Sequence, residues 1–461
     1  MLFNSLLFLV FFLIVTSGYY LLPHRFRWVW LLMASCYFYM YFKPEYLLII
    51  LFTIIVDYVA GILIERAAGH TKKIFLLASI ITNVGVLAFY KYFNFFAENL
   101  NFLSRYFHAP QIPLLNFILP IGLSFHTFQA MSYTIEVYRG NQKAERHFGL
   151  YALYVMFYPQ MVAGPIERPQ HILPQLHRAI SYNRDTFISG VFLMAVGFFK
   201  KVVIADRLGL YVDPVFSNPH GHSAIELLLA AYFFAFQIYC DFSGYSDIAI
   251  GAALTLGIEL MKNFNLPYLS HNIAVFWQRW HISLSTWFRD YVYIPLGGNR
   301  VSFYKLCRNL LVVFLVSGLW HGANWKYLVW GLIHGCLLIL YQVLKKLKIT
   351  VNGFTFLKWL ITFNLVCLAW IFFRANTVGE GMYILLTILK FKSLEYSATS
   401  LMPVKEIWYC VLIIGALLAG EWYLSAAELS TGKKIFMTLT LGIACYLLGI
   451  FNEAQFIYFQ F

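Results

Sequence analysis

Long apolar runs separated by short basic clusters recur along the whole chain. An α-helix needs about 20 mostly apolar residues to cross a bilayer, and about a dozen segments approach that length. Hydrophobic residues make up 61% of the 461 positions and charged residues only 12%, so a water-soluble globule could not cover its apolar surface. The sequence therefore predicts an all-α, polytopic integral membrane protein with about 11–12 transmembrane helices plus re-entrant or interfacial helices.

The basic clusters predict which side of the membrane each loop faces. Clusters such as Arg25/Arg27 and Arg66/Lys72/Lys73 alternate with apolar runs, and positive loops face the cytoplasm. This pattern and an even number of spans place both termini outside. The segment 149–164 is too short and interrupted to span, so we expect it to be re-entrant or interfacial, and we expect 379–391 to form a short outer-surface helix. The predicted spans are 3–22, 28–42, 46–64, 74–90, 113–134, 187–205, 224–248, 309–324, 326–344, 356–373, 407–424 and 436–451.

Other global features argue for one membrane domain over residues 1–461. No internal repeat and no long Pro, Gly or Ser linker divides the chain. The first 22 residues lack a positive leading region and a cleavage site, and are interpreted as a retained first span. The net charge of +13 lies in short clusters between apolar runs, which indicates cytoplasmic loops and not nucleic-acid binding.

Common catalytic motifs are absent from the sequence. There is no P-loop, G-x-S-x-G elbow, H-E-x-x-H or His-x4-Asp arrangement, and the seven cysteines form no C-x-x-C pair. This argues against ATP-driven transport, elbow hydrolases and zinc proteases, and predicts no metal site. Any chemistry must come from polar residues within apolar runs, where such residues are costly and are functional candidates.

The first candidate region runs from Gln237 to Asp247. Gln237, Asp241 and Tyr245 recur every four residues, so they form one polar stripe on a helix. The stripe either joins helices through hydrogen bonds or lines a cavity, and the sequence does not separate these two interpretations.

The second candidate region contains three tryptophans and two arginines between Phe276 and Asp290. Trp277, His281 and Ser285 are spaced to share a helical face, beside Arg279 and Arg289. This composition predicts a helix at the cytoplasmic interface or dipping inward. The alternative is a purely structural aromatic anchor at the interface.

The third candidate region is Ser317–Trp325, in which His321 and Asn324 end a very apolar run. Glycines flank this histidine and allow close approach of backbone or ligand. A neutral imidazole can accept and donate a proton near pH 7, as a general base must. A single histidine within a membrane more often hydrogen-bonds to a neighbouring helix and has no catalytic role. This region therefore indicates a functional site only together with the other two regions.

The order of these motifs resembles the membrane-bound O-acyltransferase superfamily, specifically the bacterial branch that acetylates extracytoplasmic polysaccharides such as alginate and peptidoglycan. Tyr158–Arg168, the opening Met1–Tyr20 and the ending Phe456–Phe459 are also typical, so the resemblance covers nearly the whole chain. The family's near-invariant histidine corresponds to His321 and its upstream histidine to His281. The resemblance implies a ring of tilted helices around a central tunnel that joins a cytoplasmic donor side to an outer acceptor side.

The resemblance also implies roles. His321 would be the general base or acyl carrier, and His281 would position the donor or hydrogen-bond its thioester carbonyl. Arg279, Arg289 and Arg300 would bind phosphates of the acyl donor, expected to be acetyl-coenzyme A with no bound cofactor. Gln237, Asp241, Tyr245, Trp277, Ser285 and Asn324 would line the tunnel or the donor site.

Three functions remain open at this stage. The first is acetyl transfer to a polysaccharide, in the bacterial cytoplasmic membrane, with an extracytoplasmic acetyltransferase as partner. The second is D-alanyl transfer to teichoic acid by the same fold. The third is a secondary transporter that uses Asp241, His281 and His321 as proton or substrate sites, although its usual paired broken helices are not visible.

Overall fold

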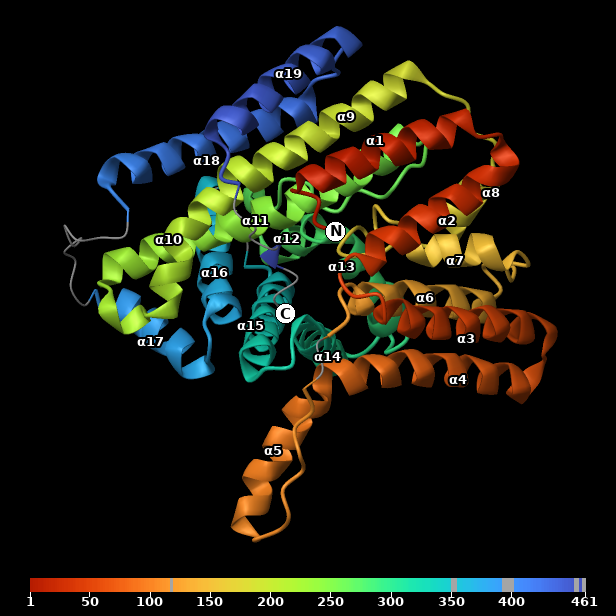
Figure 1. Cartoon of the computed structure of the whole chain (residues 1–461). Helices are drawn as coiled ribbons and strands as arrows, with labels where there is room; N and C mark the ends of the chain where they lie inside the picture. Colours follow the sequence, from red (N-terminus) through yellow and green to blue (C-terminus); the bar gives the residue numbers. More distant parts are fainter. Residues whose placement is uncertain (117–118, 350–354, 392–401, 452–455, 458–461) are drawn as a thin grey trace. The chain divides into compact units, whose positions relative to one another are not determined.

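The computed structural model describes residues 1–116, 119–349, 355–391, 402–451 and 456–457. Helices dominate this described part of the chain, and no β-strand occurs in it (Figure 1). The predicted all-α membrane fold is therefore confirmed.

The helices form two compact units. Unit 1 comprises Met1–Met194 and Ser246–Met261, and unit 2 comprises Ala195–Tyr245 and Lys262–Phe461. The helices α9 (Arg184–Phe198) and α11 (Ala224–Thr255) contribute residues to both units. Each unit is described by itself, and a single continuous domain stays a prediction.

Unit 1 is built around the neighbouring helices α3, α4 and α6 (Figure 1). Asp57 of α3 is fully buried there, and its carboxylate accepts hydrogen bonds from Ser79 and Asn83 of α4. A buried carboxylate is tolerated only with such partners. The complete elements of unit 1 are α1 (Leu6–Leu21), α2 (His24–Met40), α3 (Tyr46–Arg66), α4 (Gly69–Leu87), η1 (Ala88–Tyr92), α5 (Phe93–Tyr106), α6 (Leu123–Arg139), α7 (Phe148–Met156) and α8 (Pro169–His177).

Unit 2 has its closest helix pair in α14 and α15, which pack along their length. Short helices α12 and α13 lie between the long helices in sequence, and they carry much of the second candidate region. The complete elements of unit 2 are η2 (Phe199–Ala205), α10 (Asp206–Ser217), η3 (Pro219–Gly221), η4 (Pro267–Leu269), α12 (Ile273–Arg279), α13 (Ile282–Phe288), η5 (Arg289–Tyr293), α14 (Phe303–His321), α15 (Trp325–Lys346), α16 (Thr355–Arg374), α17 (Val378–Leu389), α18 (Val404–Ala426) and α19 (Thr431–Leu448).

Within the described residues, 8 helices are long and apolar enough to cross a membrane. The shorter apolar helices α1 and α17 coincide with the predicted segments 3–22 and 379–391. The eight are Tyr46–Arg66, Gly69–Tyr106, Arg184–Ser217, Ala224–Thr255, Phe303–His321, Trp325–Lys346, Thr355–Arg374 and Val404–Ala426.

One predicted span is half wrong. The segment 113–134 is not helical from 113 to 116 or from 119 to 122, and α6 begins only at Leu123. Pro113 and Pro120 lack the N–H that a helix interior needs, and Gly122 has a left-handed φ of 78°. The segment 149–164 contains most of the 9-residue helix α7 and the turns that follow it, and its re-entrant or interfacial position stays a prediction.

Candidate active site

His281 lies at a sharp break between α12 and α13. Its backbone is left-handed, with φ 44°, which is uncommon for a residue with a side chain. The prediction that Trp277, His281 and Ser285 share one helical face is therefore wrong. The local reason is that Trp280 and His281 leave the helical conformation, so two short helices replace one long one.

Asn263 holds the imidazole of His281 in place. Its Oδ1 accepts a hydrogen bond from the backbone N–H of Ser283 at 3.2 Å and lies 3.2 Å from His281 Nδ1. A backbone N–H can only donate, so this atom of Asn263 is the amide oxygen and an acceptor. The proton between His281 and Asn263 must therefore lie on His281 Nδ1, which leaves Nε2 as the lone-pair nitrogen of the neutral ring.

Burial keeps the His281 ring neutral. The side chain is 1% exposed, and desolvation lowers the pKa of His281 to about 3. Charging an imidazole in such an environment is unfavourable because water no longer solvates the cation. At neutral pH, His281 therefore presents a lone pair at Nε2.

His321 is the last residue of α14 and is 5% exposed. Its ring is surrounded by aromatic side chains, with the centroid of Trp330 at 5.1 Å and that of Phe373 at 5.3 Å. The indole of Trp320 contacts both histidines, with centroids 5.0 Å from His321 and 6.3 Å from His281. The structure thus brings together the two histidines that lie 40 residues apart in sequence.

Glycines allow α14 and α15 to approach closely beside His321. A Cβ at Gly318 would overlap the carbonyl oxygen of Tyr327, and one at Gly331 would overlap that of Phe314. Neither carbonyl can move without displacing a helix backbone. The position of His321 against Trp330 therefore depends on small residues at the α14–α15 contact.

A cavity of about 370 Å³ lies between α12, α13 and α14. Trp277, Ser285 and Arg289 line it, as does Ser317, one helical turn before His321. The other lining residues are mostly apolar, as in many small-molecule sites. Three residues that the sequence assigned to donor binding therefore share one cavity, with the cation of Arg289 among its lining residues.

Three other predicted residues lie outside the lining of this cavity. Asn324 caps α15, where its Oδ1 accepts a hydrogen bond from the backbone N–H of Lys326 at 3.0 Å. Arg279 ends α12, and its carbonyl accepts a hydrogen bond from Asn265. Arg300 is exposed in the turn-rich segment after η5.

The polar stripe on α11 contacts charged groups within unit 2. Asp241 accepts a 2.7 Å hydrogen bond from Lys201 Nζ and a 2.8 Å one from the backbone N–H of Ile457. The lysine also pairs with Asp206 at 2.8 Å. The ring of Tyr245 packs on Phe456 at 4.9 Å, and Gln237 is 7% exposed beside Gly209. These contacts agree with the interpretation of the stripe as a joint between segments.

The comparison with protein families decides the class of this chain. Residues 145–379 match the model of the membrane-bound O-acyltransferase family. This chain belongs to that family. It is accordingly an O-acyltransferase, and the transporter alternative is set aside.

Named relatives narrow the likeness within the family. A Pseudomonas aeruginosa protein named "Probable alginate O-acetylase AlgI" is 40% identical over 383 residues, covering 82% of this chain and 73% of the relative. The peptidoglycan O-acetyltransferase of Helicobacter pylori is 37% identical, covering 84% and 79%. The teichoic acid D-alanyltransferase of Bacillus subtilis is 28% identical, covering 58% and 71%.

The sequence reasoning missed three polar residues of unit 2. His334 is fully buried, and its Nδ1 accepts a hydrogen bond from Trp277 Nε1 at 3.3 Å. Asn263 orients His281, and Lys201 pairs with Asp241. Lys201 and His334 both interrupt apolar runs, which was a usable signal because polar groups there need partners. No such pattern marks Asn263, because its role depends on a contact with His281, which lies 18 positions later in the sequence.

Proposed function

We propose that this acyltransferase moves an acetyl group from cytoplasmic acetyl-coenzyme A through the membrane toward an extracytoplasmic polysaccharide. The observation that carries the proposal is the pair of buried histidines against the indole of Trp320. A mostly apolar cavity lies close to them in unit 2, and several of the residues predicted to bind the donor line it.

In this proposal His321 is the general base or the acyl carrier. As a base, it removes the proton of the acceptor hydroxyl while the hydroxyl oxygen attacks the thioester carbonyl. The carbon–sulfur bond breaks, and the thiolate of coenzyme A takes up a proton to leave as the thiol. As a carrier, the imidazole itself attacks the carbonyl, the carbon–sulfur bond breaks, and coenzyme A leaves as the thiol with the proton of the ring. The acceptor hydroxyl then attacks the acetyl group, the carbon–nitrogen bond breaks, and the proton of the hydroxyl returns to the imidazole.

His281 then acts through its lone pair. Its Nδ1–H is directed at Asn263 and its neutral Nε2 carries no proton, so Nε2 accepts a hydrogen bond and does not donate one. Donation to a thioester carbonyl would require the charged ring, which burial opposes. We therefore favour a role in which His281 Nε2 receives a proton or hydrogen bond from the donor, the acceptor or a water molecule.

The cavity beside α12 and α13 is the proposed donor site. Arg289 of its lining is 59% exposed in its side chain and also contacts Asp290. An exposed guanidinium beside an apolar cavity suits a donor such as acetyl-coenzyme A, whose phosphate groups would bind the guanidinium while its acyl end enters the cavity. Trp277 is fixed by His334 and would form part of the wall.

The acetyl group and the polysaccharide acceptor come from the relatives. The alginate and peptidoglycan acetylating relatives match over 80% of this chain, whereas the D-alanyltransferase matches 58%. This difference favours acetyl over D-alanyl transfer. Peptidoglycan or an alginate-like polymer is the expected acceptor, reached with an extracytoplasmic acetyltransferase as partner in the bacterial inner membrane.

The central test replaces His321 in the full chain. His321→Ala and His321→Gln should lower acetyl transfer about 10²–10⁴-fold, the usual contribution of a general base. The control is His271→Ala, because His271 is an exposed histidine of the same unit. The measurement is release of free thiol from acetyl-coenzyme A by purified protein, together with acetate released from cell-wall and exported polysaccharides.

Two results would contradict this proposal. Normal polysaccharide acetylation by both His321 variants at wild-type protein levels would exclude the role of His321. Transfer from a D-alanyl carrier protein but not from acetyl-coenzyme A would instead assign the chain to D-alanyl transfer. Thermal unfolding of each variant shows whether a loss of activity reflects chemistry or misfolding.

A further inference from the structure

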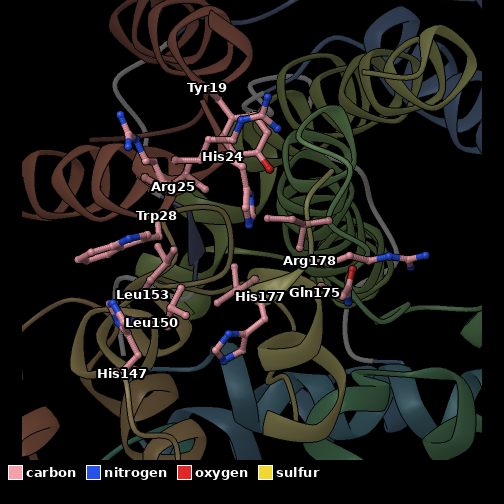
Figure 2. A pocket seen from close by; sticks show the side chains of 14 residues that line it. Tyr19, His24, Arg25, Trp28, His147, Leu150, Leu153, Gln175, His177 and Arg178 are labelled. Atoms are coloured by element: carbon pink, nitrogen blue, oxygen red, sulfur yellow. The ribbon is translucent and has the colours of Figure 1, made fainter. Parts of the chain in front are cut away.

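Unit 1 contains a cavity of about 170 Å³ whose lining is basic and aromatic at the rim (Figure 2). Three segments that are distant in sequence supply the rim. Arg25 and Arg27 come from the start of α2, His147 precedes α7, and Arg178 follows α8. Figure 2 shows Arg25 and Arg178 on opposite sides of the cavity.

The positive charge of this rim is not neutralised within the lining. None of the 14 described lining residues is acidic. Arg27 donates hydrogen bonds to the carbonyl oxygens of Leu22 and Ile180, which leave its full charge in place. Arg25 and Arg178 are exposed. The carboxylate of Glu145, which is not part of the lining, lies 2.7 Å from Nε2 of the lining residue His177, so one negative charge stands beside the three arginines of the rim.

Arg27 also makes the rim rigid. Its two carbonyl partners connect the end of α1 with the segment after α8. Its guanidinium stacks on Tyr19 with 4.7 Å to the ring centroid. A cationic site whose geometry exists before the ligand arrives loses less entropy on binding.

The deeper lining of the cavity is apolar. Leu31, Leu150 and Leu153 are buried and line it, and Ile258 is also buried there. The cavity is smaller than the roughly 300–1,000 Å³ of sites for drug-sized ligands. Its volume therefore suits one small anionic group and the start of an attached apolar chain, and not a whole nucleotide.

We propose that this cavity binds a phosphate group carried by an anionic phospholipid. Guanidinium groups bind phosphate oxygens in paired hydrogen bonds, and basic pockets between membrane helices bind anionic lipid head groups. The leucine lining accommodates the glycerol and first methylenes of the lipid. No residue of the candidate active site lines this cavity, so the site is additional to acyl transfer.

The test compares lipids on the purified full chain in a mild uncharged detergent. Phosphatidylglycerol and phosphatidylcholine with identical acyl chains are titrated, and bound lipid is counted by native mass spectrometry beside thermal unfolding. We expect phosphatidylglycerol to bind and stabilise the protein more strongly. Arg25→Gln/Arg178→Gln should weaken its binding about tenfold or more, as expected for two lost cations.

Two further variants make the result specific. Arg25→Lys/Arg178→Lys keeps both charges but loses the paired guanidinium hydrogen bonds, so it should bind phosphatidylglycerol more tightly than the glutamine variant and less tightly than wild type. Arg184→Gln removes one exposed cation six residues after Arg178 that does not line the cavity, and should leave binding unchanged. Equal loss in Arg184→Gln, or equal binding of the two lipids, would overturn the site.

Inorganic phosphate and glycerol phosphate distinguish the source of the phosphate. If neither compound stabilises the wild type at concentrations at which phosphatidylglycerol does, the result would support a phospholipid as the source of the phosphate. Stabilisation by these soluble compounds that depends on Arg25 and Arg178, with no effect of phosphatidylglycerol, would overturn the lipid source and keep the phosphate site.

Discussion

At the scale of single residues, the site depends on a histidine held in an unusual state. His281 adopts a left-handed backbone, which costs about 1–3 kcal/mol for a residue other than glycine. Histidine is one of the few side chains enriched in that conformation. The contacts that keep it there are Asn263 on its Nδ1 and the ring of Phe242 at 4.6 Å.

This state predicts a specific sensitivity to acid. Burial lowers the pKa of His281 from 6.5 to about 3, so below pH 6.5 the unfolded chain takes up a proton that the folded chain does not. The free energy of unfolding is therefore unaffected by titration of this group above pH 6.5. Below that pH it decreases by up to about 1.4 kcal/mol per pH unit. His281→Asn should therefore lose less thermal stability than wild type between about pH 7 and about pH 5.

Asparagine is the matched replacement at this position. Its side-chain N–H can donate to Asn263 as His281 Nδ1 does, it tolerates a left-handed backbone, and it does not titrate. Thermal unfolding of both proteins across that pH range is the measurement. Parallel curves for the two proteins would show that His281 is not a buried neutral imidazole. Acyl transfer should fall in this variant at every pH, because Nε2 is lost.

The residues of the site were predictable only in part. His281 and His321 stood out through their motifs, and the cavity does bring Trp277, Ser285 and Arg289 together. The break at His281 was not predictable from spacing, because helical periodicity continues through Trp277 and Ser285. The stabilising partners Asn263 and His334 depend on tertiary contacts, which local sequence patterns do not contain.

At the scale of helices, the position of His321 depends on the packing of α14 against α15. The apolar run from Leu310 predicted α14, but not which of its faces meets α15. Gly318 marks that face, since a Cβ there would overlap the carbonyl oxygen of Tyr327. Close backbone approach at small residues is the usual way in which membrane helices pack tightly.

Gly318→Ala should therefore destabilise unit 2 and reduce transfer. Inserting one methyl group into a well-packed contact costs about 1–3 kcal/mol, and here a helix backbone must move. Because Gly318 lies within a turn of His321, we expect a loss of acyl transfer larger than the loss of folded protein. Thermal unfolding and thiol release on the same preparation measure the two effects.

Gly415→Ala is the matched control for this substitution. Gly415 lies within α18, and a Cβ there would have no heavy atom within 4 Å. Alanine favours a helix over glycine by up to about 1 kcal/mol, so this variant should be neutral or slightly more stable. Equal damage from both substitutions would mean that the contact with Tyr327 does not position His321.

At the scale of the whole molecule, basic clusters and helix lengths predict how the chain crosses the membrane. The alternation of basic clusters predicted Arg25 and Arg178 on one side of the membrane, which requires 149–164 not to span. The cavity of unit 1 gathers both residues, and the side of the membrane on which they lie stays a prediction. The two-unit division was not predictable, because no linker marks it and both α9 and α11 contribute to both units.

The continuous helix Gly69–Tyr106 sets up a further expectation. Its first part, α4, has 19 residues, so at 1.5 Å per residue it is about 28 Å long and nearly spans the roughly 30 Å hydrocarbon core. After the π-helical turn η1, α5 leaves the direction of α4 (Figure 1). Because the predicted spans 28–42 and 46–64 precede α4, its first residues are expected to share the side of Arg25. Arg105 near the end of α5 should then lie on the opposite side of the membrane.

Single cysteines test this arrangement directly. In a chain whose seven native cysteines are replaced, Arg25→Cys and Arg178→Cys should react with a membrane-impermeant maleimide only after the membrane is opened, because basic loops face the cytoplasm. Arg105→Cys should react in intact cells. Labelling of Arg25→Cys and Arg178→Cys from different sides would show that 149–164 crosses the membrane. Labelling of Arg105→Cys only in opened membranes would reverse the orientation assigned to the N-terminus.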